Sequence, residues 1–146
     1  MKNCAILSMD CLDDFEAYDD LIIEPMKARG WHCEWVSWRK ENVDWDEFDV
    51  VVVRTPWDYQ EDADAFVQVL RKIDDSSAHL ENNLATMLWN IDKIYLKALE
   101  QANVNIVPTL WRDTFEAAEL TTFFEHFNTD QMVLKPRVSA NADNTF

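Results

Sequence analysis

Two lysines stand out because each lies close to the end of an expected element. Lys93 lies in the stretch Trp89–Leu96, in the first turn of a helix that Asn90 can cap. Lys135 ends an apolar run. A lysine offers a mobile positive charge and three donors, so two of them can grip a polyphosphate from two sides. The alternative is that two of the 13 Lys+Arg residues happen to lie near element ends.

A second polar cluster follows a run of four valines and reads Arg54-Thr55-Pro56-Trp57-Asp58-Tyr59. Arg54 suits a carboxylate or a phosphate, and Asp58 suits an amine or the orientation of Arg54. Trp57 and Tyr59 would shape the wall of a site for a small zwitterion. The alternative is a salt-bridged loop whose aromatic rings pack in the core, and the residues alone leave both interpretations open.

The elements before residue 84 predict the sheet that would position this cluster. Apolar runs predict strands at 3–9, 32–38, 50–53 and 79–83, with the second at an edge. Helical patterns lie at 18–29 and 62–73, and Gly30 fits the position just after a helix end; a helical turn at 84–89 begins the following part of the chain. This alternation is typical of an α/β fold: an open, mostly parallel sheet with flanking helices, in which ligands bind past the carboxyl ends of the strands.

The elements after residue 84 predict a smaller α+β unit. In chain order they are a helix after Asn90, a strand at 105–107, a helix at 115–127 capped by Thr114, and a strand at 130–135. The remaining residues, 138–146, have loop composition.

Composition excludes several classes of partner. A net charge of −15 argues against nucleic acid and against anionic membrane surfaces. The three cysteines lack metal-ligand spacing, which favours reduced thiols in a cytoplasmic protein. No apolar run approaches the ~20 residues of a membrane span. A single glycine excludes a glycine-rich phosphate loop.

Four short motifs together resemble the ATP-grasp superfamily, and within it the glutathione-synthetase-like and D-cycloserine-ligase-like group. In chain order they are Arg54-Thr55-x-Trp57-Asp58-Tyr59, Trp89-Asn90-x-Asp92-Lys93-x-Tyr95-Leu96, Val107-Pro108-Thr109, and Val133-Leu134-Lys135-Pro136 followed by Ser139 and Thr145. The resemblance covers essentially the whole chain.

The resemblance implies a pre-ATP-grasp α/β domain at residues 1–83 and the truncated beginning of an ATP-grasp small subdomain at 84–146. It implies that Lys93, Lys135, Ser139 and Thr145 lie at the nucleotide phosphates. The activity it implies is ATP-dependent ligation: a small-molecule carboxylate is phosphorylated, and an amine then displaces phosphate from the acyl phosphate. ATP and magnesium would be the cofactors of the complete parent enzyme.

The chain departs from the family pattern in two respects. The loop after Pro136 has no glycine, so asparagines must adopt the left-handed backbone there. Family members are also longer, and their additional part carries the magnesium ligands and a stabilising arginine. We therefore expect no catalytic or metal-binding residue in these 146 residues, no tight cofactor binding and no ligase turnover by this polypeptide alone.

Two alternatives of other classes remain. A response-regulator receiver domain also has acidic residues after its first strand and a Lys-Pro pair after its last one. A non-catalytic binding or assembly module is the other, because exposed aromatic rings at Trp31, Trp35, Trp38 or Trp45 could form a homodimer face.

Overall fold

The computed structural model describes all residues from Met1 to Phe146. They form two compact units, residues 1–91 and residues 92–146, which are described one at a time. We call them unit 1 and unit 2.

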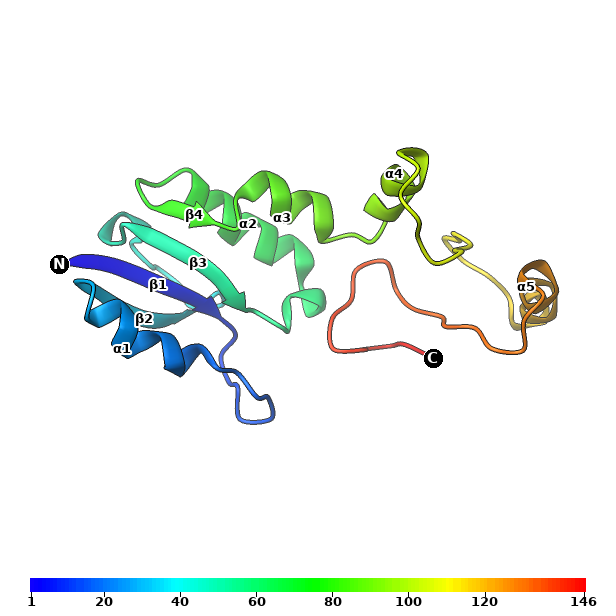
Figure 1. Cartoon of the computed structure of the whole chain (residues 1–146), viewed down its shortest axis with the longest axis horizontal. Helices are drawn as coiled ribbons and strands as arrows, with labels where there is room; N and C mark the ends of the chain where they lie inside the picture. Colours follow the sequence, from blue (N-terminus) through cyan, green and yellow to red (C-terminus); the bar gives the residue numbers. More distant parts are fainter. The chain divides into compact units, whose positions relative to one another are not determined.

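Unit 1 is built on a four-stranded parallel sheet. Its strands are β1 (Lys2–Ser8), β2 (Trp31–Ser37), β3 (Val50–Thr55) and β4 (His79–Glu81). Their order is β2-β1-β3-β4, and every neighbouring pair is parallel. Figure 1 shows β1 between β2 and β3, with β2 at an edge. The predicted open parallel sheet is therefore confirmed.

Two of the three helices of unit 1 begin at a capping side chain, and the third has a proline in its first turn. They are α1 (Ile23–Lys27), α2 (Ala63–Asp74) and α3 (Leu84–Asn90), with short 3-10 turns at Asp19–Ile22, Trp45–Glu47 and Tyr59–Glu61. Asp62 caps α2 by accepting from the amide of Ala65 at 3.0 Å. The helix predicted at 18–29 is shorter, because Pro25 lacks an amide hydrogen and fits only a first turn.

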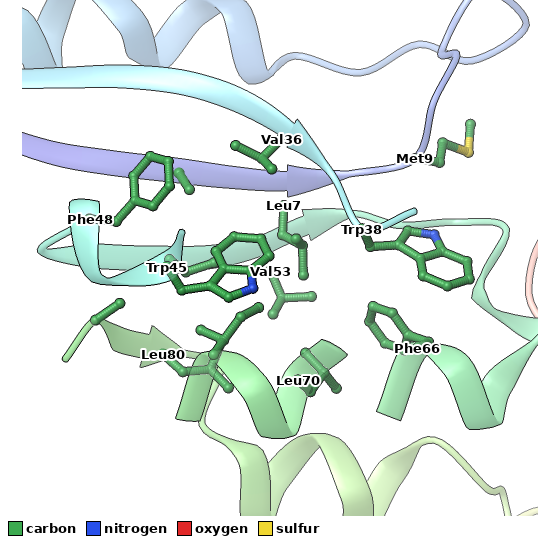
Figure 2. Close-up of a cluster of buried hydrophobic side chains, with 14 residues drawn as sticks. Leu7, Met9, Val36, Trp38, Trp45, Phe48, Val53, Phe66, Leu70 and Leu80 are labelled. Atoms are coloured by element: carbon green, nitrogen blue, oxygen red, sulfur yellow. The ribbon is translucent and has the colours of Figure 1, made fainter. Parts of the chain in front are cut away.

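The core of unit 1 lies between the sheet and α2. Phe66, Leu70 and Ile73 recur at helical spacing on one face of α2, and all three are fully buried. Figure 2 shows the indole of Trp38 directed toward the ring of Phe66, and the two centroids are 5.4 Å apart in a T-shaped arrangement. Val53 and Leu7 belong to the same buried cluster.

Unit 2 holds α4 (Tyr95–Gln101), a 3-10 turn (Ala117–Glu119) and α5 (Leu120–Phe127). The predicted helix at 115–127 begins later than expected, because Glu116 and Glu119 form the capping box instead of Thr114. The strands predicted at 105–107 and 130–135 are wrong, since these segments run as irregular chain. A strand needs a paired neighbour, and here Leu134 exchanges two backbone hydrogen bonds with Phe146 and no ladder follows. No helix of the chain has the length and apolar character to cross a bilayer.

Candidate functional site

Arg54 lies at the carboxyl end of β3, where the pairing with β1 is interrupted. Leu7 pairs with Val53 and Ser8 pairs with Thr55, so the register shifts by one residue and Arg54 is the extra one. Bulges of this kind redirect a side chain and are common beside binding sites. The bulge aims Arg54 at Asp19: its Nε and Nη2 donate to the same Oδ1 atom at 2.9 and 2.7 Å.

Asp19 is almost completely buried, with 1% of its surface exposed. Its second oxygen, Oδ2, lies 3.1 Å from the hydroxyl of Thr55, and that hydroxyl lies 3.0 Å from the hydroxyl of Ser8. The sequence analysis missed Asp19, since it is one of 28 acidic residues and stands in no motif. Only the fold brings it to the ends of β1 and β3.

Asp58 does not orient Arg54, contrary to one of the two roles predicted for it. Its Oδ1 accepts from the indole nitrogen of Trp38 at 2.6 Å, and its Oδ2 accepts from Nε of Arg39 at 2.8 Å. The guanidinium of Arg39 also lies over the Trp38 ring, 4.2 Å from its centroid, and bonds Glu61 at 2.8 Å. The hydrogen bond to Asp58 is the main cause of the raised pKa of Arg39. Asp58 therefore ties the turn after β3 to the end of β2.

The two aromatic residues of this cluster have different surroundings. Tyr59 packs 5.5 Å from the Phe66 ring, so it extends the core of unit 1. Trp57 is half-buried and lies 5.4 Å from the half-exposed ring of Phe15. Both rings are partly buried against the core, so exposure does not distinguish them. Part of the cluster is thus a salt-bridged, core-packed loop, as the alternative interpretation held.

Lys93 lies in the turn before α4, not inside the first turn of a helix. Asn90 is the last residue of α3, and the carboxylate of Asp92 accepts from the amide of Ile94 at 2.9 Å. The ammonium of Lys93 donates to the carbonyl and hydroxyl oxygens of Ser139 at 2.9 and 2.8 Å, and to the carbonyl of Arg137 at 3.4 Å.

Lys93 and Lys135 are close enough to influence each other electrostatically. Burial is the main cause that lowers the pKa of Lys93 from its usual value, and the positive charge of Lys135 lowers it further. Asp92 opposes this shift only in part, because it is bonded to Arg137, whose Nε lies 3.1 Å from Oδ1. Arg137 in turn lowers the pKa of Asp92. Two cations side by side are the arrangement that an anion stabilises.

The loop at 138–146 has the left-handed backbone that its sequence predicts. Asn141 and Asn144 have φ values of 51° and 49°, and Ala142 between them has φ 60°. The hydroxyl of Thr145 lies 3.4 Å from the carbonyl oxygen of Asp143, within the same turn. The structure therefore brings the ammonium of Lys93 onto Ser139, with Lys135 near enough to lower its pKa. Lys135 and Thr145 each adjoin one residue of the hydrogen-bonded pair Leu134 and Phe146.

The basic side chains of unit 1 and of unit 2 suit different anionic groups. An arginine held at the carboxyl end of β3 suits a carboxylate, and paired lysines beside a hydroxyl suit phosphate oxygens. No group of three or more His, Cys, Asp or Glu side chains that could hold a metal ion occurs in the structure.

The fold and these polar clusters define an α/β protein with an open parallel sheet and charged side chains past its strand ends. Residues 4–82 match the family described as the N-terminal domain of D-cycloserine synthetase DcsG, and the chain belongs to this family.

The chain is also similar to a curated protein in sequence and to a solved structure in fold. The cycloserine biosynthesis protein DcsG of Streptomyces lavendulae is 28% identical over 88 residues, which is 60% of this chain and 29% of that protein. The crystal structure of D-cycloserine synthetase DcsG has a TM-score of 0.83 and 22% identity, over 98% of this chain and 49% of that chain. The chain thus spans about half the length of the solved protein, and its match covers 29% of the curated protein.

Proposed function

We propose that this chain is the N-terminal part of an ATP-dependent carboxylate–amine ligase that acts through an acyl phosphate on a small amino-acid-like substrate. The observation that carries the proposal is the pair of cations in unit 2, where Lys135 depresses the pKa of Lys93 and Ser139 bonds the same ammonium. Membership of the synthetase N-terminal domain family supports it. In this proposal residues 1–83 are the pre-ATP-grasp domain, and 84–146 begin the ATP-grasp small subdomain.

The two units would divide the work of binding. Lys93, Lys135, Ser139 and Thr145 would hold the phosphates of ATP, since ammonium and hydroxyl groups complement phosphate oxygens. Arg54 and the exposed part of Trp57 would hold the carboxylate substrate, with Asp58 and Tyr59 fixing the turn that carries them. Magnesium would neutralise phosphate charge in the complete enzyme, and this chain contributes no acidic cluster for it.

The chemistry is a displacement at phosphorus followed by one at carbon. An oxygen of the carboxylate attacks the γ-phosphorus of ATP, ADP leaves, and an acyl phosphate forms. The amine then attacks the acyl carbon, phosphate leaves, and the amine proton passes to solvent. Lysines contribute by neutralising charge and positioning the phosphates, which is the main form of catalysis in phosphoryl transfer.

Titration of the full chain with ATP and Mg²⁺, followed by NMR at the lysine ammonium and backbone amide signals, tests the proposal. We expect weak binding that shifts Lys93, Lys135 and Ser139. Lys93→Ala and Lys135→Ala should each weaken binding about tenfold, as expected for one charge-assisted contact. Lys97→Ala is the matched control, because Lys97 lies over the Trp111 ring. ATP shifts that are equal in all variants would contradict the proposal.

The receiver alternative has a specific observation against it. Both carboxylate oxygens of Asp58 already accept hydrogen bonds, from Trp38 and from Arg39, so this aspartate is poorly placed to accept phosphate. Incubation with acetyl phosphate distinguishes the receiver domain from the ligase. Stable phosphorylation of an aspartate would favour the receiver domain, and no phosphorylation would favour the ligase.

We also propose self-association as a second property, on the exposure of one aromatic residue. Trp35 on the edge strand β2 is 46% exposed, whereas Trp38 and Trp45 are buried. Of the four tryptophans considered for a homodimer face, the buried two are therefore unsuitable. Sedimentation at several concentrations, with Trp35→Ser as the variant, tests this; a monomer at all concentrations would contradict it.

A further inference from the structure

Asp19 is the most deeply buried charged side chain of the chain, and it needs a reason to be there. Burying a carboxylate is costly unless hydrogen bonds replace its water. Three hydrogen bonds do so: two from Arg54 to Oδ1 and one from Thr55 to Oδ2. Asp19 is therefore fully engaged.

The hydroxyl groups behind Asp19 fix the direction of this network. A carboxylate accepts only, so the single proton of the Thr55 hydroxyl goes to Oδ2 of Asp19. Ser8 must then donate to the Thr55 oxygen, which lies 3.0 Å away. A chain of donors runs from Ser8 through Thr55 to Asp19, and all three residues are at least 98% buried. The hydrogen bond from Thr55 to Oδ2 thus fixes the rotation of the Asp19 carboxylate, with Oδ1 directed at Arg54.

Arg54 is not buried along with its partner. Its side chain is 47% exposed, against 2% for Asp19. Asp19 occupies Nε and one proton of Nη2 on one edge of the guanidinium, and the remaining protons lie on Nη1 and the outer side of Nη2. Those protons form a fork that matches a carboxylate. Because Asp58 is bonded to Trp38 and Arg39, it does not compete for this fork.

We propose that Asp19 is a positioning residue that holds Arg54 ready for the carboxylate of a small amino acid, at the carboxyl ends of β1 and β3. The inference rests on the proposed function and names the substrate group that this part of the site takes. The bulge at Arg54 supports it, because an ordinary ladder residue would not leave the sheet at this point. The exposure of the pair also supports it, because Asp19 is buried while 47% of the arginine side chain stays exposed.

The test is NMR of the Arg54 side-chain nitrogens in the full chain, titrated with D-serine as the probe. In the wild type we expect D-serine to shift the Nη signals of Arg54 and to leave its Nε bonded to Asp19. Asp19→Asn should weaken D-serine binding about tenfold, because the guanidinium of Arg54 is then no longer held in the orientation that meets the carboxylate. It should also speed exchange of the Nε proton. Asp20→Asn, an exposed neighbour, is the matched control.

Three outcomes would overturn the proposal. The first is that the Arg54 signals of the wild type do not respond to D-serine. The second is that folded Asp19→Asn binds D-serine as tightly as the wild type does. The third is that Asp20→Asn loses as much affinity for D-serine as Asp19→Asn. If Asp19→Asn does not fold, Thr55→Val decides, because it removes only the hydroxyl behind Asp19. It should weaken D-serine binding severalfold while Lys93 keeps its ATP response. Unchanged D-serine affinity in Thr55→Val would overturn the proposal.

The same samples separate this inference from the proposed function. ATP shifts at Lys93 with none from D-serine at Arg54 would remove the positioning role and keep the ligase. The converse result would keep a carboxylate site and remove the nucleotide site.

Discussion

Arg54 in unit 1 and Lys93 in unit 2 are both basic residues held by their own chain, but they are held in opposite ways. A buried carboxylate holds Arg54 from behind and leaves half of its side chain exposed. The three donors of Lys93 are directed at carbonyl and hydroxyl oxygens of residues 137–139. In the proposed function, the first arrangement would prepare a cation for a ligand. The oxygens that Lys93 contacts occupy positions that phosphate oxygens would take, so the proposal requires the loop to release Lys93 before a phosphate binds.

The same contrast appears in the packing of the two units. Unit 1 has a continuous buried cluster between its sheet and α2. In unit 2, Phe123 is the one buried residue, and its ring packs 5.8 Å from Phe115. Rigid packing supports a fixed site, whereas a lightly packed unit opens at lower cost. The following predictions test this comparison, beginning with the largest expected effect.

Phe66→Ala should destabilise unit 1 by about 3–5 kcal/mol, because it removes a fully buried ring and leaves a cavity beside Trp38. Urea unfolding followed at the amides of β1 measures this loss. Phe123→Ala is the comparison in unit 2, and it should leave the unfolding of β1 unchanged. The contrast between the units fails if Phe123→Ala lowers the stability of β1 as much as Phe66→Ala does.

Asp58→Ala should cost about 1–3 kcal/mol of folding stability, because it leaves the indole nitrogen of buried Trp38 and the guanidinium of Arg39 without their acceptor. Thermal unfolding of unit 1 gives the value. Glu61→Ala is the control, since its ion pair with Arg39 is more exposed and should be worth well under 1 kcal/mol. Equal losses in both variants would show that the burial of Asp58 does not matter.

Ala142→Gly should stabilise the loop at 138–146 by about 1 kcal/mol or less. Alanine at φ 60° is strained by roughly 1–2 kcal/mol, and the flexibility of glycine in the unfolded chain offsets part of the gain. Amide exchange at Asp143 and Thr145, whose amides donate within this loop, reports the change. Ala140→Gly in the same loop has no positive φ to relieve and should destabilise instead.

Acid should loosen the contact between Asp92 and Arg137, with the smallest of these effects. Arg137 holds the pKa of Asp92 below its usual value of 3.8. The stability that this ion pair adds to the folded state is therefore complete above pH 3.8 and is lost as the pH falls through the lower pKa of the folded state. The amide of Lys93, which donates to the Arg137 carbonyl at 3.0 Å, should exchange faster in that range. Asp92→Asn should remove the pH dependence; if the dependence stays, another carboxyl causes it.

Much of unit 1 could be predicted from its sequence, because its signals are local. Consecutive valines indicate a buried strand, and the spacing of Phe66, Leu70 and Ile73 indicates one face of a helix. The left-handed asparagines of the last loop were also predictable, since a chain with a single glycine has few other residues for that backbone.

The parts that failed depend on contacts between distant residues. Asp19, Arg54 and Ser8 lie far apart in the sequence, and a register shift brings them together. The same holds for Asp58, whose partners come from the end of β2. The segments 105–107 and 130–135 have strand composition, but composition does not supply the neighbouring strand that pairing requires.

The sheet order also fixes when each part of the protein can mature during synthesis. β1 is made first but lies inside the sheet, so it cannot be paired on both sides until β3, Val50–Thr55, has left the ribosome. Once α2 and β4 have followed, unit 1 can fold while later residues are still being added. Lys93 comes after unit 1, and Ser139, which bonds its ammonium, lies 46 residues beyond Lys93. A nascent chain therefore completes the setting of Arg54 before that of Lys93.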